Sequence, residues 1–155
     1  MKPSTMLKII AVSISMAILT ACASTGSHSN PKVGTPEQSH DYLQSKPLQT
    51  LLKSSLNPQD YAGLNANLKQ FSTPFALKEG SKYYEARDDN TSTASAIVVT
   101  PQQLFYLAYQ LPNSHDTVYI TNDVRCQTTL HPGMQIFNHV YPKDKLVNRP
   151  DYNRN

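Results

Sequence analysis

The feature that most constrains the fold is a series of three strand-like segments joined by connections too short for crossover helices. Residues 97–100 are β-branched, residues 104–110 form an apolar run with three aromatic side chains, and residues 117–128 alternate apolar with polar. These patterns are typical of strands. Parallel neighbours need a crossover of a dozen or more residues, whereas these segments are separated only by turns. The sequence therefore predicts an antiparallel sheet.

Two apolar stripes with helical spacing precede the strand-like segments. Leu48, Leu51 and Leu52 mark the first stripe, with Ser45 as a candidate N-cap, and residues 61–71 carry the second. A further apolar run at residues 134–141 predicts a last strand. The expected fold class is α+β, with a small antiparallel sheet of about four strands and one or two N-terminal helices. The stripes are interpreted as core packing, and a partner-binding helix is the alternative.

The N-terminus has the pattern of a secretory signal. Lys2 and Lys8 are followed by an apolar run from Ile9 to Leu19. This run is shorter than the roughly 20 apolar residues of a membrane-spanning helix. It fits the apolar core of a signal peptide, which holds about 7–15 residues. We therefore expect residues 1–21 to be a signal peptide.

The run ends in Leu19-Thr20-Ala21-Cys22, which resembles the lipobox of bacterial lipoproteins. The resemblance implies that diacylglycerol is attached to the Cys22 sulfur as a thioether and that cleavage precedes this residue. Three acyl chains would then anchor the protein durably, since stable anchoring takes at least two. Ala23 and Ser24 follow, where an aspartate would retain a lipoprotein in the inner membrane. The resemblance thus implies an outer-membrane protein with a periplasmic domain.

Composition divides the rest of the chain. Residues 22–41 are rich in Ser, Gly, Pro and Thr and nearly free of large apolar side chains, which predicts a lipidated cysteine followed by a disordered tether. Residues 42–148 form the expected α+β domain, and residues 149–155 form a polar, loose tail.

Charge gives no case for a nucleic-acid partner. Subtracting Lys2 and Lys8 from the 14 basic residues leaves 12, against 11 acidic residues. Such a balanced domain lacks the basic surface that binds nucleic acid. The expected partners are the membrane, through the lipid anchor, and an envelope protein or glycan of unknown identity.

The chain has two cysteines, Cys22 and Cys126. If Cys22 is acylated, no internal disulfide is possible in the monomer. Alternation places Cys126 on one strand face with Val118, Ile120 and Val124, which predicts a buried thiol that behaves as a small apolar group. Pairing between chains is the alternative, and a catalytic role has little to support it.

No metal or cofactor is predicted. Cys126, His131 and His139 are the nearest approach to a metal site, but a structural zinc site usually has four ligands with closer pairing. The chain also lacks a nucleotide-binding loop, a G-x-S-x-G elbow and an H-E-x-x-H motif.

Tyrosine is the one residue type in excess, with nine copies and no tryptophan. Tyr83, Tyr84 and Tyr119 are the expected exposed copies, and tyrosine supplies rigid contact area with a polar tip. Arg125 and Asp123 share a predicted strand face. They are expected either to form an exposed ion pair or to contact a partner. Packing within the sheet is the alternative for the tyrosines.

Residues 95–129 resemble the uncharacterised periplasmic family called cryptic neisserial protein-like. The matching positions are Tyr106, Ser114, Val118, Arg125, Cys126 and Thr128. The glycine that precedes the Arg-Cys pair in that family is replaced by Val124. The resemblance implies no activity, because the function of that family is not established.

These features together predict an outer-membrane lipoprotein with a non-enzymatic binding or structural role in the envelope. The alternative is an envelope inhibitor of a hydrolase such as lysozyme.

Overall fold

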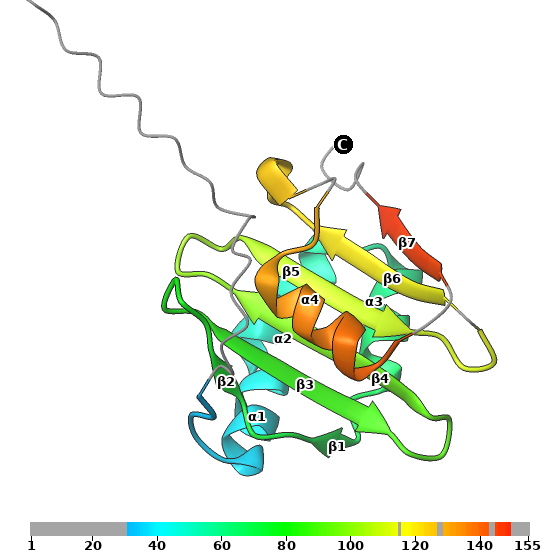
Figure 1. Cartoon of the computed structure of the whole chain (residues 1–155), viewed down its shortest axis with the longest axis horizontal. Coiled ribbons are helices and arrows are strands. Elements are labelled where there is room, and N and C mark those ends of the chain that lie inside the picture. The colour runs from blue at the N-terminus through cyan, green and yellow to red at the C-terminus, as the bar shows by residue number, and fades with distance from the viewer. Residues whose placement is uncertain (1–30, 115, 127–128, 143–144, 150–155) are drawn as a thin grey trace, which may run out of the picture.

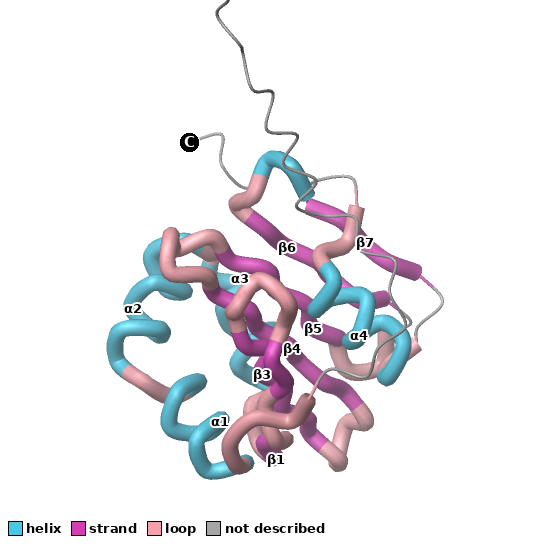
Figure 2. Tube along the Cα trace, turned by 60° about the vertical axis from the view of Figure 1, so that its left-hand side comes forward, coloured by secondary structure: helices cyan, strands magenta, loops and turns pink. Residues whose placement is uncertain are grey.

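The computed structural model describes residues 31–114, 116–126, 129–142 and 145–149. A twisted sheet forms the centre, with three helices on one face and a fourth helix on the other (Figures 1 and 2). The predicted α+β fold class is therefore confirmed. The predicted signal peptide and Cys22 lie outside the described residues.

The first helix, α1, occupies Pro36–Leu43, within the predicted tether of residues 22–41. That prediction is wrong from residue 31 onward. Thr35 and Gln38 form a capping box in which the side chain of each accepts the backbone N–H of the other, which satisfies N–H groups at the helix start. Leu43 is fully buried and Tyr42 packs beside it, so the C-terminal end of this otherwise polar helix is held against the sheet.

The two predicted helices are present as α2, Lys46–Ser55, and α3, Pro58–Ala66. Ser45 is the N-cap residue of α2, although its side chain makes no capping hydrogen bond. Gly63 lets α3 lie close to the sheet, because a Cβ atom there would come within 2.4 Å of the Tyr109 ring. The predicted packing of both stripes is confirmed by five buried leucines: Leu48, Leu52, Leu56, Leu64 and Leu68.

The sheet has seven strands instead of about four. They are β1 (Gln70–Phe71), β2 (Phe75–Ala76), β3 (Lys82–Asp88), β4 (Thr93–Val99), β5 (Phe105–Gln110), β6 (Asp116–Thr121) and β7 (Lys145–Arg149). The order is β1-β3-β4-β5-β6-β7, with β2 also pairing with β3. All pairs are antiparallel except β6 with β7, which are parallel. The short turns thus produce the predicted hairpins.

Helix α4, Pro132–Val140, replaces the predicted last strand at residues 134–141. His131 caps the helix by accepting the Gly133 N–H, and a proline occupies the first turn. Met134 and Phe137 are three residues apart and both fully buried, as on one helix face. Because α4 connects β6 to β7 across one face of the sheet, these two strands are parallel (Figure 1).

Two separate cores result from this arrangement. The helical core lies between α1–α3 and the sheet, and the α4 core lies between the sheet and α4. Along β5, Leu107 and Tyr109 face the helical core, whereas Tyr106 and Ala108 face the α4 core. Residues 104–110 are apolar on both faces for this reason.

Candidate functional site

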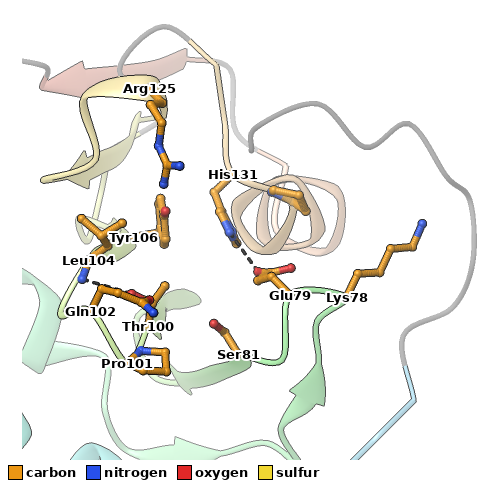
Figure 3. Close-up of a pocket in the computed structure, with 11 residues that line it drawn as sticks. Lys78, Glu79, Ser81, Thr100, Pro101, Gln102, Leu104, Tyr106, Arg125 and His131 are labelled. Carbon is orange, nitrogen blue, oxygen red and sulfur yellow. Dashed lines mark hydrogen bonds and ion pairs between the residues drawn. The ribbon is translucent and has the colours of Figure 1, made fainter. Parts of the chain in front are cut away.

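A pocket of about 470 Å³ lies on the α4 side of the sheet, beside the N-terminal end of α4. Its walls come from the turn before β3, the β4–β5 turn, the segment after β6 and the start of α4 (Figure 3). The volume is within the range of small-molecule sites, about 300–1,000 Å³. Segments far apart in the sequence therefore meet at one concave site.

Ser81 is the unusual residue of this pocket. Its side chain is buried, with 6% of the residue exposed, and its hydroxyl is the only buried side-chain polar atom of the described residues without a hydrogen-bond partner. In Figure 3 the hydroxyl points into the pocket. Leaving a buried hydroxyl without a partner costs about 1–3 kcal/mol. Ser81 is therefore placed to bind a group that enters from outside.

His131 forms the opposite wall and is locked in one orientation. Its Nδ1 accepts the Gly133 N–H at 3.1 Å, and its Nε2 lies 3.0 Å from Oε1 of Glu79. Because Nδ1 is an acceptor, the ring proton is on Nε2 and is donated to Glu79. This hydrogen bond lowers the pKa of the Glu79 carboxyl. Tyr106 stacks on the imidazole at a centroid distance of 3.9 Å.

Arg125 reaches the pocket from the 3₁₀ helix Val124–Cys126 (Figure 3). Its Nε and Nη2 donate to the two carboxylate oxygens of Asp123, both at 2.9 Å. The Tyr106 hydroxyl donates to the same carboxylate at 2.6 Å. The hydrogen bonds from Arg125, followed by that from Tyr106, lower the pKa of Asp123 to about 2. Asp123 is thus a buried anion that fixes the direction of the guanidinium.

The expected exposure of three tyrosines is wrong. Tyr83 and Tyr119 are completely buried, and Tyr84 is 9% exposed. The sheet is covered on both faces, so Tyr83 and Tyr119 pack in the α4 core and Tyr84 in the helical core, where it stacks on Tyr42. Burial raises the pKa of all three phenols. Packing within the sheet, the alternative reading, is confirmed.

Arg125 is the predicted contact residue that remains exposed, with 41% of its side chain accessible. The predicted pair with Asp123 forms, but it is not a surface pair, because only 3% of the Asp123 side chain is exposed. The expected strand ends at Thr121, and the chain then turns to bring Asp123 beneath the sheet edge toward Tyr106. A role of Arg125 in binding a partner stays a prediction.

Cys126 is fully buried, as predicted, but not on the predicted face. It packs in the α4 core, whereas Val118 and Ile120 pack in the helical core and Val124 is 71% exposed. The 3₁₀ helix breaks the alternation that the prediction assumed.

The expectation of a free Cys126 thiol is also corrected. The sulfur takes part in a disulfide bond, and Cys126 is the only cysteine among the described residues. The reasoning that excluded a disulfide assumed that Cys22 is acylated.

Ser81 and Glu79 were not singled out from the sequence, whereas Tyr106 entered only as a position of the family resemblance and His131 only as a rejected metal-ligand candidate. Their signals are local and weak, since they sit in separate turns and strands that only the fold brings together. The role of His131-Pro132-Gly133 as a helix start was not predicted, because residues 134–141 were expected to form a strand. No group of three metal-binding side chains occurs in the described part of the chain. The His139 side chain is exposed on α4.

Comparison with known protein families, with characterised proteins and with solved structures finds no match to this chain. The resemblances to the lipoprotein lipobox and to the cryptic neisserial protein-like family therefore stay predictions. Within the described residues, no helix has the length and apolar character needed to cross a membrane.

Proposed function

We propose that this chain is an outer-membrane lipoprotein whose periplasmic domain binds a small ligand in the pocket beside α4, without catalysing a reaction. The observation that carries the binding function is the Ser81 hydroxyl, which is buried, without a partner and directed into the pocket. A ligand group that hydrogen-bonds to this hydroxyl would remove its desolvation cost.

The neighbouring groups support binding more than catalysis. A nucleophilic serine requires a base within hydrogen-bond reach. The Ser81 hydroxyl has no such bond, and both nitrogens of His131 are engaged, one by Gly133 and one by Glu79. His131 therefore holds the pocket wall in place and is not positioned to activate Ser81.

The envelope location is supported by the sequence. The charged start, the short apolar run and Leu19-Thr20-Ala21-Cys22 together form the pattern of a lipoprotein signal. In the proposed mature protein the Cys22 sulfur carries a thioether.

Ser81→Ala separates a binding role from a structural one. Removing an unpartnered buried hydroxyl should leave stability unchanged or raise it by up to about 1 kcal/mol, while weakening ligand binding. Ser39→Ala is the matched control, because Ser39 is also buried but its hydroxyl donates to the Ser72 carbonyl at 2.6 Å. This control should lose about 1 kcal/mol and bind ligand normally. Urea unfolding gives the stability of each variant.

Ligand retention is measured by mass spectrometry of small molecules that co-purify with the detergent-solubilised protein after exposure to envelope extract. The wild type and Ser39→Ala should retain a compound that Ser81→Ala loses. Equal retention by all three proteins, or none, would contradict the proposed site. Inhibition of lysozyme by the wild type and by Ser81→Ala alike would instead favour the inhibitor alternative.

A further inference from the structure

We infer that the pocket receives a short peptide or peptide-like carboxylate, with the carboxylate on Arg125 and an amide group on Ser81. This inference rests on the proposed binding function and adds the chemical class of the ligand.

Arg125 is the anion-binding element. Nε and Nη2 of Arg125 donate to Asp123, whereas Nη1 of Arg125 has no hydrogen-bond partner among the described residues. Figure 3 shows the guanidinium directed toward Tyr106 and the interior of the pocket. A guanidinium held in a fixed plane by two hydrogen bonds presents its remaining N–H groups in the geometry that suits a carboxylate.

Asp123 does not compete for the ligand as an acceptor. Besides Arg125, it accepts hydrogen bonds from the Tyr106 hydroxyl and from the Arg125 backbone N–H. Its carboxylate is buried, so an incoming molecule meets the arginine and not the aspartate. Asp123 is thus a positioning residue for Arg125.

Ser81 faces the pocket from the side opposite Arg125 (Figure 3). A hydroxyl both donates and accepts, so it can pair with either the N–H or the C=O of an amide. Leu104, Pro101 and Pro132 add apolar surface to the same walls. A carboxylate at one end, an amide at the other and apolar contacts between them describe a short peptide.

The charges of the lining favour one negative charge on the ligand. Arg125 and Lys78 are cationic, and Glu79 is the one carboxylate among the lining residues. Oε1 of Glu79 already accepts from His131, and Lys78 extends away from the pocket in Figure 3. Arg125 is therefore the charged group that a ligand meets, and a neutral saccharide would offer it no anion.

The test compares trialanine with its C-terminal amide by titration calorimetry on the full-length protein in detergent. The wild type should bind trialanine, and the amide should bind at least tenfold more weakly, because it lacks the carboxylate. Arg125→Lys keeps the charge but loses the planar fork, so it should bind trialanine at least tenfold more weakly. Lys53→Gln, at an exposed position of α2 outside the pocket, is the matched control and should bind trialanine like the wild type.

Equal binding of acid and amide by the wild type, or no binding of either peptide, would overturn the inference, and neither result depends on a variant that must fold. N,N′-diacetylchitobiose serves as the neutral saccharide probe. If it binds and trialanine does not, the peptide inference fails while the proposed binding function stands. Co-purification of a compound lost in Ser81→Ala tests that function separately, so the two failures are distinguishable.

Discussion

Asn67→Ala is expected to lower the free energy of unfolding by about 3–5 kcal/mol, since it removes several buried hydrogen bonds and leaves their partners unpaired. The Asn67 amide nitrogen donates to the Ala94 and Gln110 carbonyls, both at 2.9 Å, and its oxygen accepts the Thr93 hydroxyl at 2.6 Å. The side chain therefore joins the end of α3 to β4 and β5. A loss of this size is a large part of a total stability of about 5–15 kcal/mol.

Asn65→Ala is the matched control for Asn67. The Asn65 amide bonds only to the Tyr61 carbonyl one turn earlier in the same helix, and the side chain is half-buried. Its replacement should change stability by no more than about 0.5 kcal/mol. Urea unfolding followed by circular dichroism measures both variants. If Asn67→Ala unfolded at the same urea concentration as Asn65→Ala, the asparagine would not be the connection between helix and sheet that its contacts indicate.

Cys22→Ser is expected to abolish lipid labelling and to release the protein from the membrane fraction. A serine hydroxyl does not replace the thiol on which the thioether is built. Each buried CH₂ of an acyl chain contributes about 0.8 kcal/mol to membrane binding. Without these chains, the proposal includes no other membrane anchor for the domain. Metabolic labelling with a fatty acid and fractionation of the envelope measure the two effects.

Cys126→Ser is the control that separates the two cysteines. If Cys22 is the acylated residue, this variant should keep its lipid and its membrane location. Unchanged labelling of Cys22→Ser would contradict the lipoprotein proposal.

The hairpins from β4 to β6 and the helices α2 and α3 were predictable because their signals are local. Short turns exclude crossover connections, and the leucine spacing in residues 48–56 is that of a helix face. Residues 104–110 have apolar side chains on both faces because both faces of β5 are buried. The covering layer on the second face is α4, and that helix was predicted as a strand.

The error at α4 also affected the expectation for two tyrosines. Without a helix over the second face, Tyr83 and Tyr119 were expected in solvent, whereas they pack beneath α4. A short apolar run does not distinguish a strand from a helix by period alone. The start of α4 is set by the His131 side chain, which accepts a backbone N–H in a place where serine or asparagine is the usual signal.

The candidate site was not predictable from local patterns. Ser81 becomes unusual only when the surrounding turns bury it without a partner, and Arg125 becomes an anion-binding group only when Asp123 is buried beside it. Both properties arise from contacts between segments that are distant in the sequence. The residue types alone suggested an exposed ion pair and gave Ser81 no role.

The most direct test of the ligand-binding proposal is a crystal structure of the protein purified from its native envelope in mild detergent. Electron density for a small molecule within hydrogen-bond distance of the Ser81 hydroxyl and the Arg125 guanidinium is the expected result. A pocket that holds only ordered water, one of which hydrogen-bonds to Ser81, would satisfy the hydroxyl without a ligand and would contradict the account.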